Sequence, residues 1–172
     1  RSMADNLYLF MTVALGILAI SDLVVGVSND AVNFLHSALG SKAVPFRTIM
    51  FVASIGIAFG ALSSSGMMEV ARKGIFNPQE FVFAEIMIIF MAVMITDVLI
   101  LDFFNTLGMP TSTTVSIVFE LLGAAVAVTL LKIADTGESL MNVGTYINTD
   151  KASEIIIGIL LSVLIAFSIG AI

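Results

Sequence analysis

The sequence predicts an all-α membrane protein that crosses the bilayer with about five helices. Hydrophobic residues make up 59% of the 172 positions, charged residues only 12%, and the mean hydropathy is +1.10. Because soluble domains carry about 25% charged residues, this low charge indicates that lipid surrounds most of the chain. Five apolar segments each approach the roughly 20 residues that a helix needs to span about 30 Å of hydrocarbon.

The apolar segments follow one another with short polar connections. The first is too long for the hydrophobic part of a signal peptide and no small-residue cleavage site follows it, so we expect it to stay in the protein as a spanning helix. We predict one transmembrane unit over residues 1–172, with helices near 7–27, 48–68, 81–104, 112–131 and 155–172 and a hydrophilic loop at 133–153.

The second predicted helix carries Gly56, Gly60 and Ser64 at four-residue spacing. Small residues at this spacing form a face that lets a neighbouring helix approach closely. We interpret this face as a packing surface.

A first polar motif, "GVSNDAVN", follows the first apolar segment at residues 26–33. On a helix, Asn29, Asp30 and Asn33 share one flank, because residues three or four apart are neighbours. Polar groups at membrane depth need burial in protein or contact with a watery cavity, and broken helices with polar midpoints are typical of the binding sites of secondary transporters. We therefore predict that the first helix is interrupted at 28–33.

A second polar motif, "NTLGMPTSTTVS", separates the third and fourth apolar segments. Gly108 and Pro110 interrupt the helical pattern, and Pro110 suits the first turn of the next helix because proline has no N–H to leave unpaired. Residues 111–114 then place free N–H groups and hydroxyls at a positively polarised helix end, which is an anion-binding arrangement.

With five spanning helices, both polar motifs reach the same side of the protein. We therefore predict that Asp30 and Thr113 lie within the reach of one small ligand. Further along the fourth segment, Ser112, Ser116 and Glu120 continue a polar stripe at four-residue spacing.

Four acidic residues also lie in apolar segments, and each costs about 2.5–3.5 kcal/mol at the bilayer centre, so each is expected to face protein or water. Asp97 and Glu120 are candidate ligands for a coupling ion or proton, with polar contact between helices as the alternative. Asp102 lies near a helix end, where we expect water. The fourth is Asp22.

Composition excludes several classes of function. The chain has no cysteine and one histidine, which leaves no disulfide and no ordinary zinc site. Its formal net charge of −6 disfavours nucleic acid as a partner. Because the sequence contains neither a phosphate-binding loop for nucleotides nor a nucleophile elbow, we expect no enzyme activity and no cofactor.

Four short motifs together resemble one repeat of the inorganic phosphate transporter (PiT) family. They are "SNDAVN", "GSKA" at 40–43, "RKGI" at 72–75 and "GMPTSTT" at 108–114, and they occur in the family's order within residues 5–132. Members of that family resemble a duplicated unit with two inverted halves, and "RKGI" indicates the N-terminal half. The resemblance implies symport of phosphate with Na⁺ or H⁺ as the coupling ion.

The resemblance also implies site residues. Phosphate would be bound by both motifs, at Asn29, Asp30, Asn33, Thr111, Ser112, Thr113 and Thr114. The coupling ion would be held by Asn29, Asp30 and Asn33, with Na⁺ placed at Asp30 and Asn33. The chain departs from the family where Val27-Ser28 replaces Gly-Ala and where Val115 replaces a histidine.

An acid beside an anion requires an explanation. A Na⁺ ion at Asp30 would neutralise the site. Alternatively, Asp30 would accept a hydrogen bond from the O–H that phosphate retains and sulfate lacks. Sulfate or a metal–phosphate complex as cargo, and a scaffold subunit that transports nothing, are the alternative interpretations.

The expected surroundings are a lipid bilayer, most simply that of the cell membrane, and a second repeat. Asn-Asp-x-x-Asn occurs once in the chain, whereas a carrier of this type needs two repeats around a shared site. We therefore expect either a missing second repeat or a homodimer partner.

Overall fold

Five helices are long and apolar enough to cross a membrane, as the sequence predicts. The structure is a computed structural model that describes residues 3–65, 69 and 74–172. The long helices are α1 (Met3–Ser41), α2 (Phe46–Ser63), α4 (Phe83–Leu107), α5 (Thr113–Thr136) and α7 (Thr149–Gly170). The prediction of an all-α multi-pass membrane protein is confirmed.

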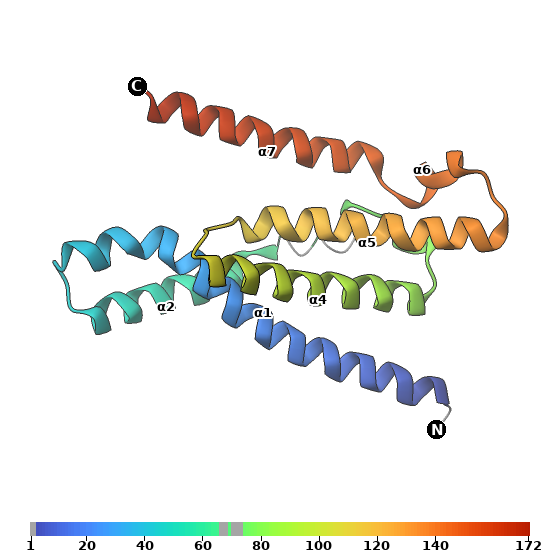
Figure 1. Cartoon of the computed structure of the whole chain (residues 1–172), viewed down its shortest axis with the longest axis horizontal. Helices are drawn as coiled ribbons and strands as arrows, with labels where there is room; N and C mark the ends of the chain where they lie inside the picture. Colours follow the sequence, from blue (N-terminus) through green and yellow to red (C-terminus); the bar gives the residue numbers. More distant parts are fainter. Residues whose placement is uncertain (1–2, 66–68, 70–73) are drawn as a thin grey trace.

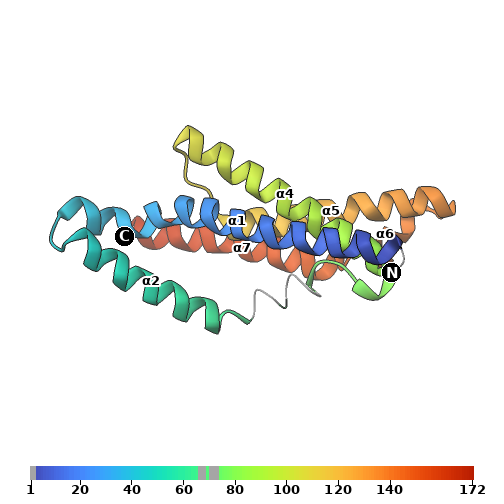
Figure 2. The same ribbon diagram turned by 90° about the horizontal axis from the view of Figure 1, so that it is seen from below.

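Helices α1, α4 and α5 pack side by side as the central bundle (Figures 1 and 2). Its interior is mainly apolar, with Ile89 and Leu101 of α4 and Ala125 of α5 fully buried, but it also holds the buried Asp97 of α4 and Thr129 of α5. By contrast, most side chains on the outer faces of these helices are exposed apolar residues, as lipid contact requires.

A compact connection closes one end of the bundle. The segment before α4 pairs with the segment before α7 through an antiparallel bridge between Phe76 and Ile147. Lys132 of α5 forms an ion pair of 3.0 Å with Glu85 of α4 and lies over the rings of Phe81 and Tyr146. This end of the bundle is therefore fixed by both polar and aromatic contacts.

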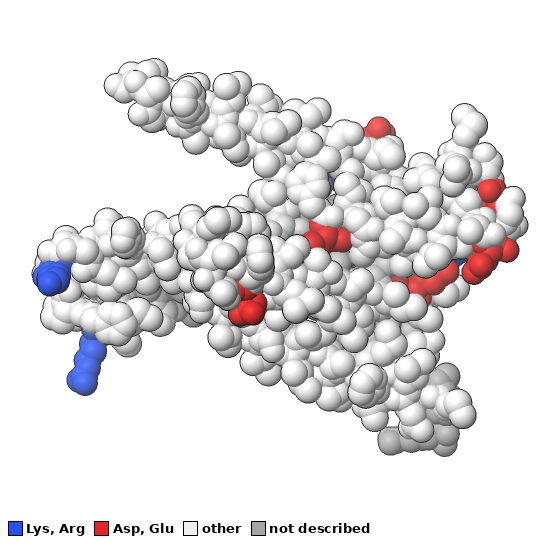
Figure 3. Space-filling view, in the orientation of Figure 1, with Lys and Arg blue, Asp and Glu red and all other residues white. Residues whose placement is uncertain are grey.

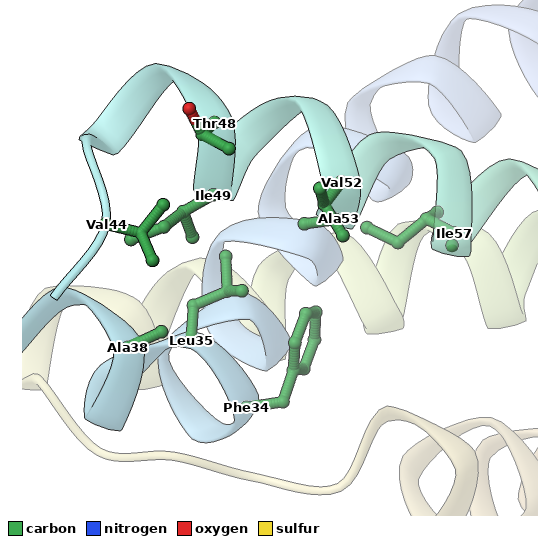
Figure 4. A pocket seen from close by; sticks show the side chains of 10 residues that line it. Phe34, Leu35, Ala38, Val44, Thr48, Ile49, Val52, Ala53 and Ile57 are labelled. Atoms are coloured by element: carbon green, nitrogen blue, oxygen red, sulfur yellow. The ribbon is translucent and has the colours of Figure 1, made fainter.

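At the opposite end, α1 continues past the bundle and turns back into α2 to form a helical hairpin (Figure 1). A mainly apolar groove of about 500 Å³ lies between the two helices of the hairpin (Figure 4). Outside the backbone of α2 itself, no atom of the described residues lies within 4 Å of the Cβ position of Gly56 or Gly60. The small-residue face of α2 is therefore open among the described residues, and its role in packing stays a prediction.

Helix α7 leads away from the bundle in Figure 1. Its first turn holds the buried Ala152, but residues 160–172 are all exposed. Together with α2, it presents wide apolar surface that no other described residue covers.

The prediction that the first helix is interrupted at 28–33 is wrong. The described backbone is helical without a break from Met3 to Ser41. The reason is that the polar side chains are satisfied without disturbing the helix: the Ser28 hydroxyl donates to the Val24 carbonyl at 2.6 Å, and Asn29 and Asp30 bind groups on neighbouring helices.

The loop predicted at 133–153 is also shorter than expected. Helix α5 continues to Thr136 and α7 begins at Thr149, and the connection contains two short helical turns, η3 (Leu140–Asn142) and α6 (Val143–Tyr146). Hydrophilic residues here extend helices beyond the apolar spans, because a helix can continue into water. Arg72 and Lys73 of the "RKGI" motif lie outside the described residues.

Candidate functional site

The non-helical connection between α4 and α5 sits against the middle of α1. Gly108 ends α4 in the left-handed conformation, with φ of 67°, which glycine adopts without steric cost. Ser112 caps α5 by accepting a hydrogen bond from the Val115 N–H at 3.4 Å. Pro110 lies before this cap, so the prediction that it occupies the first turn of the helix is wrong, and Thr113 takes that position.

Asn29 links α1 to this connection. Its side chain is 4% exposed, and its amide nitrogen donates to Asn105 Oδ1 at 2.9 Å and to the Met109 carbonyl at 3.3 Å. Its oxygen accepts from the Thr111 N–H at 2.9 Å. Asn29 thus satisfies groups at the end of α4 and along the connection to α5.

Asn105 completes the link, because its amide nitrogen donates to the Val25 carbonyl of α1 at 3.0 Å. The sequence interpretation did not identify Asn105 as part of the site. A single asparagine at the end of an apolar helix looks like an ordinary helix end, and its partner Asn29 lies 76 positions away. The one feature of the sequence that could have identified Asn105 as a site residue is its position five residues before Pro110.

Asp30 is bound directly to the start of α5. The Thr113 hydroxyl donates to Asp30 Oδ2 at 2.9 Å. The prediction that these two residues lie within the reach of one small ligand is confirmed. We call the group Asn29, Asp30, Asn105, Thr111 and Thr113 the amide cluster.

Three of the residues predicted to bind phosphate lie outside the amide cluster. Asn33, one turn beyond Asn29, is exposed and forms no hydrogen bond with the described residues. Ser112 and Thr114, which flank Thr113 in the sequence, are also exposed. The structure therefore brings Asp30 together with Thr113 and Asn29 with Thr111, but it does not bring Asp30 and Asn33 onto a common partner.

An open cavity of about 540 Å³ with both polar and apolar lining borders the amide cluster on one side. Its lining includes Ser28, Asn29, Asn105 and the exposed Asp102. Since one water occupies about 30 Å³, the cavity has room for a hydrated small anion. Asp102 faces this open space, which agrees with the prediction that it is in water.

A second, smaller cavity of about 200 Å³ borders the amide cluster through Asp30 and Thr113, and also contains Asp22 and Asp97. Asp97 is 1% exposed. One oxygen each of Asp22 and Asp97, and both carboxylate oxygens of Glu120, are buried without a hydrogen-bond partner among the described residues. We call Asp22, Asp97 and Glu120 the acid cluster. Of its members, Asp22 was not singled out as a site residue from sequence.

Charged groups are distributed unevenly along the molecule. Figure 3 shows basic side chains at the tip of the α1–α2 hairpin and acidic side chains at mid-length and at the opposite end. Both ion pairs of the described residues, Lys132–Glu85 and Lys151–Glu154, involve neither cluster. No three acidic or histidine side chains in the described part converge closely enough to hold a metal ion.

The start of α5 offers chemistry for an anion. The N–H groups of Thr113 and Thr114 belong to the first turn of a helix of 24 residues, where no intrahelical acceptor is available. The helix dipole polarises this end positively. The arrangement can therefore bind a small oxyanion through N–H and hydroxyl donors.

Five spanning helices with polar, ligand-sized space at a helix break inside the bundle define a multi-pass membrane protein whose site lies between helices. A family model described as the phosphate transporter family matches residues 26–172, which include both polar motifs. The chain therefore belongs to the phosphate transporter family, and it is a transport protein rather than an enzyme. Comparisons with curated proteins and with solved structures found no match.

Proposed function

We propose that the chain forms one repeat of a cation-coupled phosphate symporter, and that phosphate binds where Asp30 of α1 meets the start of α5. The observation that carries the proposal is the 2.9 Å hydrogen bond between the Thr113 hydroxyl and Asp30. This hydrogen bond joins a helix end that can bind an anion to a carboxylate that can accept a hydrogen bond from a protonated anion.

The selectivity for phosphate follows from what each oxyanion can donate. Phosphate at neutral pH keeps at least one O–H group, whereas sulfate keeps none. Asp30 already accepts one hydroxyl, that of Thr113, and a phosphate O–H would replace or join it. Sulfate has no O–H to donate, so it would place its negative charge beside the Asp30 carboxylate without a hydrogen bond between the two, and like charges repel strongly in a poorly solvated site.

The transport step requires a site that opens and closes around the anion. The amide cluster holds α1 against the α4–α5 break through the four hydrogen bonds that Asn29 and Asn105 form. A bound phosphate would compete for Thr113 and the neighbouring N–H groups. Occupancy of the site would thereby change how firmly α1 is attached to α5.

Coupling requires a cation, because an anion enters a site that already contains Asp30. Na⁺ or H⁺ would reduce this repulsion. Asn33 is exposed, which argues against the expected Na⁺ position between Asp30 and Asn33 in this conformation.

The experiment that tests the proposal is uptake of labelled phosphate by the intact protein in liposomes. Asp30→Asn is expected to remove nearly all uptake while the protein stays folded and inserted, because the charge and the strong acceptor are lost. Asp135→Asn is the matched control, since Asp135 is an exposed acid near the other end of α5, and it is expected to transport normally.

Unchanged uptake kinetics in Asp30→Asn would exclude a direct role for Asp30. A wild-type protein that neither binds nor transports phosphate would favour a scaffold function instead. Competition by sulfate as strong as that by unlabelled phosphate would contradict the proposed role of the O–H group.

The proposed second repeat is supported by the apolar surfaces that α2 and α7 leave open. Residues 160–172 of α7 are exposed, and a Cβ added at Gly56 or Gly60 of α2 would meet no described atom from another element within 4 Å. The 172-residue chain alone is expected to show little coupled transport, and addition of a second repeat is expected to restore it. Robust ion-driven uptake by a monomer of this chain would contradict the proposal.

A further inference from the structure

We propose that Asp22 of α1 and Asp97 of α4 form a proton-binding pair that carries the coupling proton of phosphate transport. This inference rests on the proposed function, since it names the ion and the residues that couple it. Neither residue belongs to the two polar motifs.

The geometry brings the carboxyl groups of the half-buried Asp22 and the buried Asp97 to one small cavity. Both line the cavity of about 200 Å³, and they lie within hydrogen-bonding reach of each other. Asp97 is 1% exposed. The second oxygen of each carboxyl group has no partner among the described residues.

Two carboxylates this close cannot both stay ionised, because like charges in a poorly solvated site repel strongly. The other titratable groups around Asp97 increase this repulsion: Asp30 lines the same cavity, and Glu120 of α5 acts on Asp97 electrostatically. No ion pair of the described residues involves any of these groups. One proton shared between the two carboxyl groups removes a charge and supplies the missing hydrogen bond.

A shared proton needs only two oxygen atoms close to each other, which the carboxyl groups of Asp22 and Asp97 provide. Na⁺ would need additional oxygen ligands, from carbonyl, amide or hydroxyl groups.

The pair is placed to control phosphate binding. Asp22 lies eight residues before Asp30 on the same helix, a distance of about 12 Å, and both side chains line one cavity with Thr113. At an effective dielectric constant of about 20, removal of one negative charge at this distance changes the affinity for an anion by about tenfold. Phosphate would therefore bind better when the pair holds its proton.

The test uses Asp97→Asn in the intact protein reconstituted in liposomes, with Asp135→Asn as the control. One measurement is exchange of labelled phosphate at equal pH and equal phosphate concentration on both sides. The other is accumulation of phosphate driven by an inward proton gradient, with a pH-sensitive dye inside the liposomes.

Asp97→Asn is expected to keep exchange and to lose gradient-driven accumulation together with the accompanying acidification. At alkaline pH, where the wild-type pair has released its proton, the variant is expected to bind phosphate up to about tenfold more tightly than wild type. Asp22→Asn is expected to behave in the same way, and it serves as the test if Asp97→Asn does not fold.

Retention of both exchange and gradient-driven accumulation in Asp97→Asn would overturn the proton pair, and so would loss of both. Accumulation by wild type that follows a Na⁺ gradient and ignores the pH gradient would also overturn it. The proposed function fails separately, if Asp30→Asn leaves exchange unchanged.

Infrared spectra give a readout independent of transport. The protonated-carboxyl band of wild type at neutral pH should disappear in Asp97→Asn, and an unchanged band would contradict the proton pair.

Discussion

The amide cluster and the acid cluster lie in the same three-helix bundle, about two helical turns apart along α1, yet their polar atoms are partnered very differently. In the amide cluster, Asn29 and Asn105 form four hydrogen bonds between them and their surroundings. In the acid cluster, four carboxylate oxygens have no partner among the described residues. Burial is similar, because Asn29 is 4% and Asp97 1% exposed.

The difference indicates that the two clusters have different roles. A buried polar group that is fully hydrogen-bonded stabilises the fold, whereas one without a partner is a cost that a folded protein tolerates at functional sites. We therefore interpret Asn29 and Asn105 of the amide cluster as the structural link at the α4–α5 break, beside the proposed phosphate ligands, and the acid cluster as a site that a proton completes.

Leucine has a volume similar to that of asparagine and aspartate, so leucine substitutions made separately at Asn29 and Asp97 give the strongest test of this difference between the clusters. Asn29→Leu is expected to lower the free energy of unfolding by about 2 kcal/mol, because three hydrogen bonds are lost at roughly 0.6 kcal/mol each in a membrane protein. Reversible unfolding in mixed detergent micelles measures the change. An unchanged free energy of unfolding would contradict the structural role of Asn29.

Asp97→Leu is expected to change stability in the opposite direction. Removal of a buried acid without a full set of partners should raise the free energy of unfolding by about 1 kcal/mol or more, at the expense of coupled transport. The same unfolding assay tests this change. A destabilisation as large as that of Asn29→Leu would show that the two clusters do not differ in the way described.

Thr113→Val sharpens the comparison within the amide cluster. Valine keeps the shape of threonine and removes only the hydroxyl that donates to Asp30, so the expected loss of stability is about 0.6 kcal/mol. The free energy of phosphate binding should weaken by more than this change in stability, since Thr113 is also a proposed phosphate ligand. Equal phosphate binding by Thr113→Val and wild type, measured by calorimetry, would remove Thr113 from the site.

The number of spanning helices could be predicted from the sequence because the length of an apolar segment must match the thickness of the bilayer. Sequence reasoning failed at 28–33, where polar residues were interpreted as a helix break. A polar residue that breaks a helix and one that faces another helix have the same sequence signature. Only the position of the partner, here the α4–α5 connection, distinguishes the two.

The same limit applies to the site. The meeting of Asp30 with Thr113 could be predicted, because helix count alone places both motifs on one side. The roles of Asn105 and Asp22 could not, since each depends on a side chain of another helix. Pairing between helices depends on rotation about the helix axis, which five apolar segments do not specify.

The most direct test of the central claim is the position of an oxyanion in an experimental structure of the intact protein. Arsenate mimics phosphate, and its anomalous scattering locates arsenic without bias. We predict one peak with oxygen atoms within hydrogen-bonding distance of Asp30 and of the Thr113 hydroxyl. A single well-occupied peak elsewhere, with the Asp30–Thr113 hydrogen bond still intact, would contradict the account.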